Sequence, residues 1–141
     1  MTPKQRDYFM GLSSVELMAR LIWGEARGES LEGQVAVGCV VMNRVKGKPR
    51  YGKTVHGVIL KHKQFSCFNE DNPNFTHMLN GPGDDPMLNK LFVVSEMVIL
   101  GYAKDVTYGA THYNTRDCDP TWDDNMKLTK IIKNHEFYLE I

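Results

Sequence analysis

One carboxylate, Glu25, lies at the end of an apolar stripe in the segment IWGEARGE, residues 22–29. The residues ten, seven, four and three positions earlier are apolar and would share one helical face with it: Val15, Met18, Leu21 and Ile22. A charge directed at a core is costly unless it is paired or neutral. A carboxyl in apolar surroundings keeps its proton more readily and can act as a general acid. The residues alone support this interpretation and an ordinary ion pair with Arg27 or Arg44 equally.

Two later segments carry side chains suited to a carbohydrate. QFSCFN, residues 64–69, interleaves aromatic rings with amide and hydroxyl groups. Rings of this kind can pack on sugar faces, and the polar groups can bind sugar hydroxyls. GATHYN, residues 109–114, places a threonine, a histidine and a tyrosine after a glycine. Each segment also has a structural interpretation, as a core strand or aromatic turn for the first and as a loop with a structural histidine for the second.

Neither a metal site nor a disulfide framework is indicated. The segment DCDPTWDDN, residues 117–125, begins like an EF-hand calcium-binding loop. Such a loop needs Gly at its sixth position and Glu at its twelfth. This chain has Trp122 and Leu128 at those positions, so the segment is not an EF-hand loop. The cysteines are odd in number, widely spaced and without a CxxC pair: Cys39, Cys67 and Cys118. We expect no metal and no cofactor. A nucleophilic pair of a cysteine with a histidine stays open as an alternative, although no signature surrounds any of the three cysteines.

Helices are expected to position the first of these segments. Ser13 and Glu16 form an S-x-x-E capping box, which predicts a helix from about Ser14 to Ala26 with Glu25 in its last turn. Ser30 can cap a second helix over residues 31–45, and this stretch is apolar on nearly all sides, which indicates a buried helix.

The remaining chain predicts shorter elements and loops. A short helix is expected over 53–61, and the Asn-, Asp-, Pro- and Gly-rich stretch 69–86 is typical of a long loop. Asp85 and Pro86 then begin a helix that runs to about Tyr102. A loop should follow as far as Asn125, and the C-terminal tail predicts two short strands around Lys133-Asn134.

The length and composition of the chain limit the classes of protein to which it can belong. The chain has 141 residues with 42% hydrophobic content, which fits one domain over residues 1–141. Lys plus Arg and Asp plus Glu both number 17, so no charge imbalance points to nucleic acid or to an anionic membrane. The N-terminus lacks the apolar core of a signal peptide, and no apolar run is long enough to span a membrane. We expect a monomer that is made in the cytoplasm.

Several blocks together resemble the spore-cortex-lytic, SleB-type cell-wall hydrolase family. They are ARLIWGEARGESLEGQVAVGCVVMNRV, QFS, YGATHY, PTW and NHEFY, which run from about Leu17 to Tyr138. The resemblance implies an α+β, mainly helical, lysozyme-like domain with a small β element. It also implies cleavage of peptidoglycan glycan strands at the MurNAc–GlcNAc β-1,4 bond, with Glu25 as the single catalytic glutamate.

The same resemblance predicts where the substrate binds. QFS and GATHY must converge on the C-terminal end of the first helix if they share chemistry with Glu25. Glu29 should lie at the margin of that cleft, although negative charge near the start of the next helix is favourable in any case. His135 is a further candidate. The substrate-binding residues expected are Glu29, Gln64, Phe65, Ser66, Thr111, His112, Tyr113 and Trp122.

The motifs favour a lytic transglycosylase over a hydrolytic muramidase. A hydrolase needs a second carboxylate across the sugar, about 5–5.5 Å away for retention or about 6.5–9.5 Å for inversion. The motifs bring no second carboxylate opposite Glu25, and the Asp-rich stretches at 84–85 and 117–124 lie in expected loops. A non-catalytic peptidoglycan-binding module, with rings such as Trp23 and Trp122 as stacking surfaces, is the non-enzymatic alternative.

The family's spore enzymes usually carry a signal peptide and a wall-binding domain, and this sequence shows neither. We therefore expect a bacteriophage endolysin that reaches the cell wall, in the periplasm or outside the cell, through a holin-type lesion. A virion-mounted domain is the other possibility.

Overall fold

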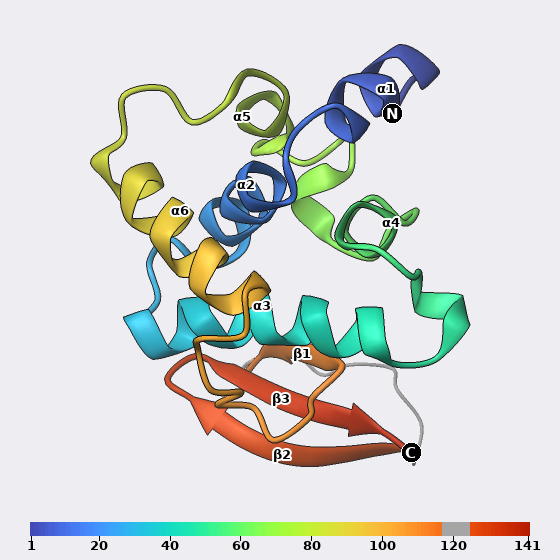
Figure 1. Cartoon of the computed structure of the whole chain (residues 1–141), viewed down its shortest axis with the longest axis vertical. Helices are drawn as coiled ribbons and strands as arrows, with labels where there is room; N and C mark the ends of the chain where they lie inside the picture. Colours follow the sequence, from blue (N-terminus) through green and yellow to red (C-terminus); the bar gives the residue numbers. More distant parts are fainter. Residues whose placement is uncertain (117–124) are drawn as a thin grey trace.

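The computed structural model describes residues 1–116 and 125–141. Its helices are α1 (Pro3–Met10), α2 (Ser14–Ala26), α3 (Leu31–Lys46), α4 (Val55–Ile59), α5 (Phe75–Asn80) and α6 (Pro86–Ile99), with 3₁₀ turns η1 (Pro49–Tyr51) and η2 (Ser66–Phe68). Its strands are β1 (His112–Thr115), β2 (Met126–Ile132) and β3 (His135–Glu140). In Figure 1, α3 runs across the middle of the molecule, with the other helices on one side of it and the sheet on the other.

The predicted helix starts are confirmed by side-chain caps. Ser13 Oγ accepts a hydrogen bond from the Glu16 amide, and Ser30 Oγ accepts one from the Gly33 amide. Asp85 caps α6 in the same way through the Met87 amide. Each cap satisfies one of the amides that a helix leaves unpaired in its first turn. The boundaries predicted for α2 agree with the structure, whereas α6 ends at Ile99 rather than near Tyr102.

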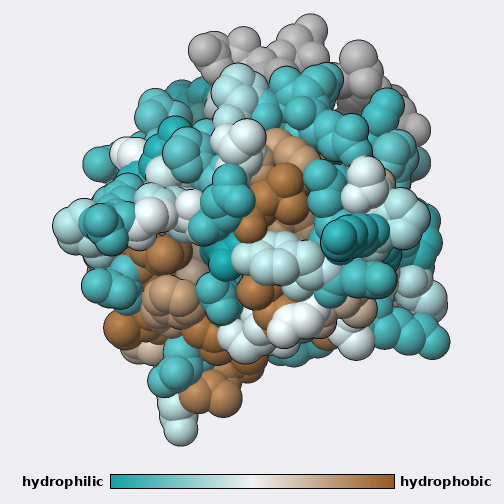
Figure 2. Space-filling model, turned by 90° about the horizontal axis from the view of Figure 1, so that it is seen from above, coloured by the Kyte–Doolittle hydropathy of each residue, from teal (hydrophilic) through white to brown (hydrophobic). Residues whose placement is uncertain are grey.

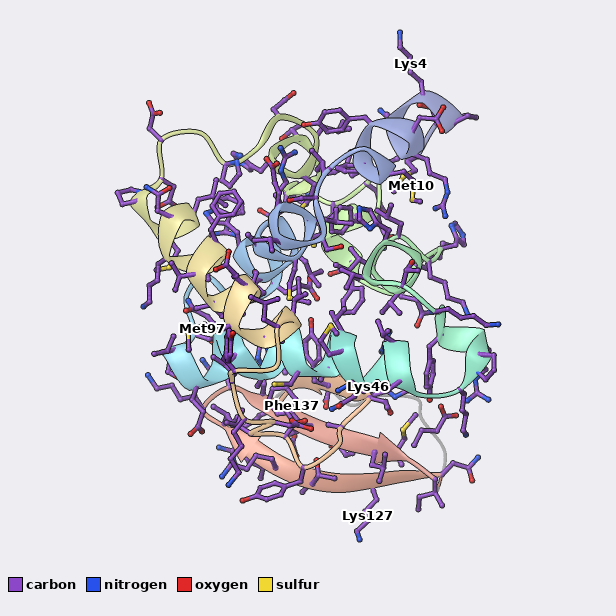
Figure 3. The ribbon with its side chains drawn as sticks, in the orientation of Figure 1. Lys4, Met10, Lys46, Met97, Lys127 and Phe137 are labelled. Atoms are coloured by element: carbon purple, nitrogen blue, oxygen red, sulfur yellow. The ribbon has the colours of Figure 1, made fainter. Side chains whose placement is uncertain are left out.

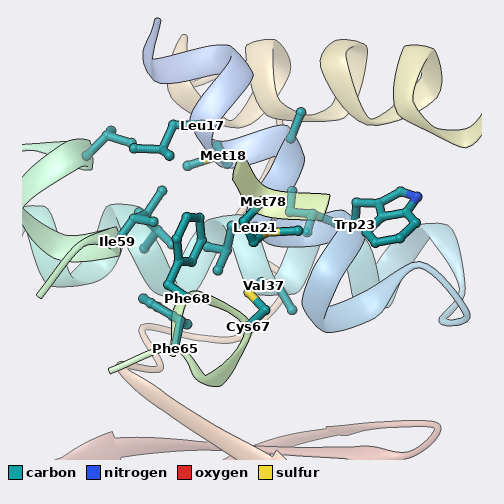
Figure 4. Close-up of a cluster of buried hydrophobic side chains, with 14 of the residues drawn as sticks. Leu17, Met18, Leu21, Trp23, Val37, Ile59, Phe65, Cys67, Phe68 and Met78 are labelled. Carbon is teal, nitrogen blue, oxygen red and sulfur yellow. The ribbon is translucent and has the colours of Figure 1, made fainter. Parts of the chain in front are cut away.

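The main core surrounds α2. Its buried face meets side chains from α3, α4, α5, α6 and η2 in one hydrophobic cluster. Figure 4 shows this cluster, whose labelled members are Leu17, Met18, Leu21, Trp23, Val37, Ile59, Phe65, Cys67, Phe68 and Met78. Burial on this scale holds the last turn of α2 rigidly, because each buried aliphatic side chain contributes roughly 1.5–3 kcal/mol.

Helix α3 separates two cores, which explains why its sequence is apolar on nearly all sides. Val37 and Val41 pack into the main core around α2. Ala36 and Val40 face the sheet instead, where they join a smaller cluster with Phe137. Figure 3 shows Phe137 directly beneath α3.

The sheet has the order β1-β3-β2, and both pairs are antiparallel. The predicted turn at Lys133-Asn134 joins β2 to β3, and Lys133 adopts a left-handed backbone conformation with φ of 48°. In the other pair, His112 lies opposite Tyr138 and Thr115 lies opposite His135. The register of pairing with the central strand β3 therefore sets the position of β1 beneath α3.

Two sequence expectations are wrong, and one helix was not predicted at all. Helix α1 was not predicted, because Phe9 is its only fully buried residue and the segment has no apolar stripe. Helix α5 lies inside the segment expected to be a loop, and it forms because Phe75 and Met78 reach the core. The GATHYN segment was expected to be a loop, but β1 begins at His112 because β3 supplies its hydrogen bonds.

Some side chains of the helices have an exposure that is unusual for their residue type. Arg20 of α2 is buried, and it donates to the Met78 carbonyl and pairs with Glu16. Val93 and Met97 are exposed on α6, as is Leu100 directly after it, and Figure 2 shows hydrophobic surface on the side of the molecule where α6 lies. Among the described residues, no helix has the length and hydrophobicity needed to cross a membrane.

Candidate active site

Glu25 occupies the last turn of α2 and is half-buried. The Tyr113 hydroxyl of β1 donates a hydrogen bond of 2.6 Å to Glu25 Oε1. The Ser66 hydroxyl of η2 lies 3.4 Å from Glu25 Oε2 and donates to it. Both carboxylate oxygens therefore have a donor from a different part of the chain, and these donors fix the orientation of the carboxyl.

Glu25 lines a cleft of about 650 Å³. Its walls come from the end of α2, from Arg44 of α3, from residues 63–66, and from β1 with the start of β3. The lining residues are Gly24, Glu25, Arg44, Lys63, Gln64, Phe65, Ser66, His112, Tyr113, Asn114, Thr115 and His135. The volume lies within the range of 300–1,000 Å³ that is usual for ligand-binding clefts.

Glu25 is the only carboxylate among the described residues that line this cleft. Glu29 lies outside the lining and faces the β2–β3 turn, where Asn134 Nδ2 donates to its Oε2 over 3.3 Å. Its other oxygen is 3.7 Å from His135 Nδ1. Asp85 is occupied elsewhere, because it caps α6 and accepts a hydrogen bond of 2.8 Å from the Trp23 indole.

Tyr113 is held as a permanent hydrogen-bond donor. Burial raises the pKa of Tyr113 well above its usual value, and the neighbouring charge of Glu25 raises this pKa further. The hydroxyl therefore keeps its proton at any pH at which the protein would act. The ring itself packs against His135 and Phe137, with centroid distances of 5.2 and 5.7 Å.

Gly24 and Cys67 are in close contact next to Glu25, where α2 packs against η2. A Cβ atom added to Gly24 would lie 2.8 Å from Cys67 Cβ, so only glycine lets α2 approach η2 this closely. Burial raises the pKa of the Cys67 thiol well above its ordinary value, and that of Cys39 to about 11. Neither thiol forms the thiolate that a cysteine nucleophile requires. Cys118 lies outside the described residues.

Arg44 joins two walls of the cleft. This buried guanidinium donates to the Thr111 carbonyl over 2.6 Å and to Gln64 Oε1 over 3.1 Å. It also lies over the ring of Phe65 at 5.1 Å. Burial lowers the pKa of Arg44 from its ordinary value. No carboxylate of the described residues forms an ion pair with Arg44, although the charge of Glu140 acts on it at longer range and favours its charged form.

His112 is a neutral side chain in this site. Burial lowers its pKa to about 4, and the positive charge of Arg44 acts in the same direction. Its Nδ1 lies 3.0 Å from the Thr111 hydroxyl, and its ring packs edge-on against Tyr51. His112 can therefore exchange hydrogen bonds with a ligand near neutral pH, but it carries no charge there.

The structure brings most of the expected site residues together. Those that line the cleft with Glu25 are Gln64, Phe65, Ser66, His112 and Tyr113, with His135 beside them. Thr111 is buried behind the wall, where its hydroxyl accepts from the Glu140 amide. Glu29 contacts His135 from outside the lining, and Trp122 lies outside the described residues.

Sequence reasoning missed these lining residues: Gly24, Arg44, Lys63, Asn114 and Thr115. The signal for Arg44 was present, since it is an arginine in the NRV block at the end of an otherwise apolar helix. Trp23, considered as a stacking surface, is instead 6% exposed and packs beneath the guanidinium of Arg27 at 4.0 Å. The described residues contain no group of three or more His, Cys, Asp or Glu side chains placed to hold a metal ion.

A family model described as Cell Wall Hydrolase matches residues 28–138. Spore cortex-lytic enzymes from Oceanobacillus iheyensis and Bacillus subtilis are 44% and 41% identical to the chain over 55 residues. That segment is 39% of this chain and 20% and 18% of those two proteins. The match thus spans about a fifth of the length of these curated relatives.

Two solved structures are similar over most of the chain. The catalytic domain of the germination-specific lytic transglycosylase SleB from Bacillus anthracis has a TM-score of 0.70 and 28% identity, and covers 91% of this chain and 97% of that one. The catalytic domain of SleB from Bacillus cereus has a TM-score of 0.68 and 29% identity, and covers 91% and 92%. With the helices and three-stranded sheet described above, these similarities confirm the predicted α+β, mainly helical, lysozyme-like class.

Proposed function

Because the chain belongs to the cell wall hydrolase family, we propose that it cleaves peptidoglycan glycan strands at the MurNAc–GlcNAc β-1,4 bond, with Glu25 as the catalytic acid. The observation that carries the proposal is the position of Glu25, whose carboxyl opens into the cleft while Tyr113 and Ser66 hold both of its oxygens. The family match itself begins at Gly28, so the role of Glu25 rests on this geometry and on the sequence motif.

The first step is proton donation. A glycan strand lying in the cleft places its scissile oxygen within reach of Glu25, which gives its proton to that oxygen as the bond to the MurNAc C1 carbon breaks. The leaving GlcNAc keeps this proton on its new hydroxyl. Positive charge then develops at C1 and on the ring oxygen, next to the carboxylate that Glu25 has become.

The second step distinguishes a transglycosylase from a hydrolase. Among the described residues that line the cleft Glu25 is the one carboxylate, and in its ionised form it can accept the proton of the C6 hydroxyl of the same MurNAc. The C6 oxygen then bonds to C1 and closes a 1,6-anhydro ring, and Glu25 regains its proton. An internal hydroxyl has a large proximity advantage over water, so no second carboxylate is required.

The other lining groups suit an uncharged sugar polymer. Gln64, Asn114 and His112 offer amide and imidazole groups for sugar hydroxyls and acetamido groups. His112 is neutral at the pH of most media because burial lowers its pKa to about 4. We propose that these groups position the strand so that the scissile oxygen meets Glu25.

Product analysis tests this proposal. Purified sacculi digested with the protein should release muropeptides ending in 1,6-anhydroMurNAc, which mass spectrometry identifies by the absence of one water relative to the reducing form. Products ending in reducing MurNAc would make the protein a hydrolytic muramidase. Binding to sacculi without release of soluble fragments would identify a peptidoglycan-binding module instead.

The expected role as a bacteriophage endolysin stays a prediction. It is tested by expressing the chain inside a bacterium with and without a holin. An endolysin should lyse the culture only when the holin is induced, and lysis that does not depend on the holin would contradict this role.

A further inference from the structure

A second groove, of about 660 Å³, lies next to the cleft. One wall comes from α1 and the other from residues 60–71, and the Arg6 guanidinium joins them by donating to the Leu60 carbonyl over 3.1 Å. In Figure 1, α1 lies on the same side of the molecule as α4 and the segment that follows it. Principal lining residues are Arg6, Leu60, Lys61, Lys63, Phe68 and Asp71.

The cleft and the second groove adjoin each other, because Lys63 and Phe65 line both of them. A branched molecule bound in the cleft can therefore extend a branch past Lys63 toward the groove. The peptidoglycan strand is such a molecule, because each MurNAc carries a short peptide on its lactyl group that projects away from the glycan. An extended peptide advances about 3.3–3.6 Å per residue, so a stem several residues long reaches beyond the cleft that holds its MurNAc.

The charges of the second groove fit a ligand that is mostly anionic. Among the described residues, Arg6, Lys61 and Lys63 form no ion pair. Glu70 is already paired with the amino group of Met1 at 2.7 Å, and Asp71 is the other carboxylate of the lining. Peptide stems carry several carboxylates, so the excess of cations is complementary to them.

Lys63 is also held in an unusual backbone conformation. Its φ of 58° lies in the left-handed region that bulky residues rarely adopt. Residues held in this region occur preferentially at ligand-binding sites, where the surrounding structure maintains the strain. Here the conformation places a lysine at the junction between the two cavities.

We propose that the second groove binds the peptide stem of the MurNAc whose glycosidic bond lies at Glu25, with Lys61 and Lys63 contacting the stem carboxylates. This inference rests on the proposed function and adds a specificity site to it. The protein should consequently prefer glycan strands that carry their peptides. Because α1 lies outside the residues that the family model matches, the Arg6 wall is a feature of this chain that the family match does not cover.

Three substrates test the proposal with the full chain. The first is peptidoglycan with intact stems, the second is the same glycan stripped of peptides by an amidase, and the third carries stems whose carboxylates have been amidated with carbodiimide and ammonia. Wild-type protein should show kcat/KM about tenfold higher on intact strands than on stripped strands, mainly through KM, as two exposed charge contacts would give. Amidated strands should behave like stripped ones.

Two variants in the groove should abolish this preference. Lys61→Glu reverses an exposed charge, and Lys63→Asn removes one while keeping a residue that tolerates positive φ. The ratio of kcat/KM between intact and stripped strands should fall to between one and about three in each. Lys127→Gln is the matched control, since Lys127 is exposed on β2 at the opposite end of the molecule (Figure 3) and should keep the wild-type ratio.

The results distinguish failure of the stem-binding proposal from failure of the proposed function. Equal rates of wild-type protein on intact and stripped strands, or an unchanged ratio in Lys61→Glu and Lys63→Asn, would overturn the stem-binding proposal and leave the glycan-cleaving function standing. Folded wild-type protein that cleaves none of the three substrates would overturn the proposed function, and the stem-binding proposal with it.

Discussion

The hydroxyl of Tyr113 contacts the carboxyl of Glu25 across 88 positions of sequence, with an oxygen–oxygen distance of 2.6 Å. Tyr113 lies on β1, which pairs with β3, and Glu25 lies on α2, which is surrounded by helices. The contact therefore joins the sheet to the helical part of the molecule at the point where the proposed chemistry takes place. Its strength depends on both parts being correctly folded.

Tyr113→Phe should lower kcat by about 10- to 100-fold and change KM little. The variant keeps the ring and its packing against Phe137 but removes the donor that orients Glu25 Oε1. A misplaced catalytic group can cost about 10²-fold even when the fold is intact. Steady-state kinetics on soluble glycan strands measure this effect. A variant with wild-type kcat would show that Glu25 does not need Tyr113.

Glu25→Gln should reduce glycan cleavage by at least about 100-fold, because general acid catalysis contributes typically 10²–10⁴-fold. Glu29→Gln is the matched control, since Glu29 lies four residues further along the chain and outside the cleft lining. It should retain most of the activity. Clearing of a peptidoglycan suspension, with circular dichroism to establish folding, measures both. An equal loss in the two variants would indicate a two-carboxylate hydrolase.

Gly24→Ala should lower the free energy of unfolding by about 1–3 kcal/mol, the usual cost of overpacking a core. The added Cβ would lie 2.8 Å from Cys67 Cβ, and α2 would have to move away from η2. Gly28→Ala is the control, because its Cβ would meet no atom within 4 Å, and its effect should stay within about 0.5 kcal/mol. Urea denaturation measures both values, and similar stabilities would contradict the close packing of α2 on η2.

Arg44→Met should destabilise the protein by about 2–4 kcal/mol. The methionine fills part of the space but leaves the Thr111 carbonyl and Gln64 without their charged donor. Lys46→Met, two residues away on the exposed side of α3, should change stability by less than about 0.5 kcal/mol. Thermal unfolding of the two variants compares them, and equal melting temperatures would show that the Arg44 contacts add nothing to stability.

His112 should make the protein less stable in mild acid. Its folded-state pKa of about 4 lies below the ordinary value of 6.5, so between these values the unfolded chain binds more protons than the folded one. The free energy of unfolding therefore falls as pH decreases from about 6.5 to about 4, and this contribution is constant above about 6.5. His112→Asn should flatten this part of the stability profile by several degrees in melting temperature. Parallel profiles of wild type and variant would contradict the shifted pKa.

Much of the helical part was predictable because its signals are local. The caps at Ser13, Ser30 and Asp85 lie within three residues of the amides they bind, and the apolar stripe that ends at Glu25 is a property of one helix. Helix α5 was missed because its formation depends on burying Phe75 against distant parts of the core, which no local pattern reveals.

The sequence by itself determined the apolar stripe that ends at Glu25, the buried helix after Ser30 and the strand pair around Lys133-Asn134, since periodicity and turn chemistry act over a few residues. The tertiary structure alone decided which oxygen of Glu25 accepts the hydrogen bond of the Tyr113 hydroxyl. It also decided that Arg44 donates to both Thr111 and Gln64. Thr111 itself lies behind the cleft wall rather than in it. The reason is that strand register and helix packing set these distances, and both arise from contacts between residues far apart in the chain.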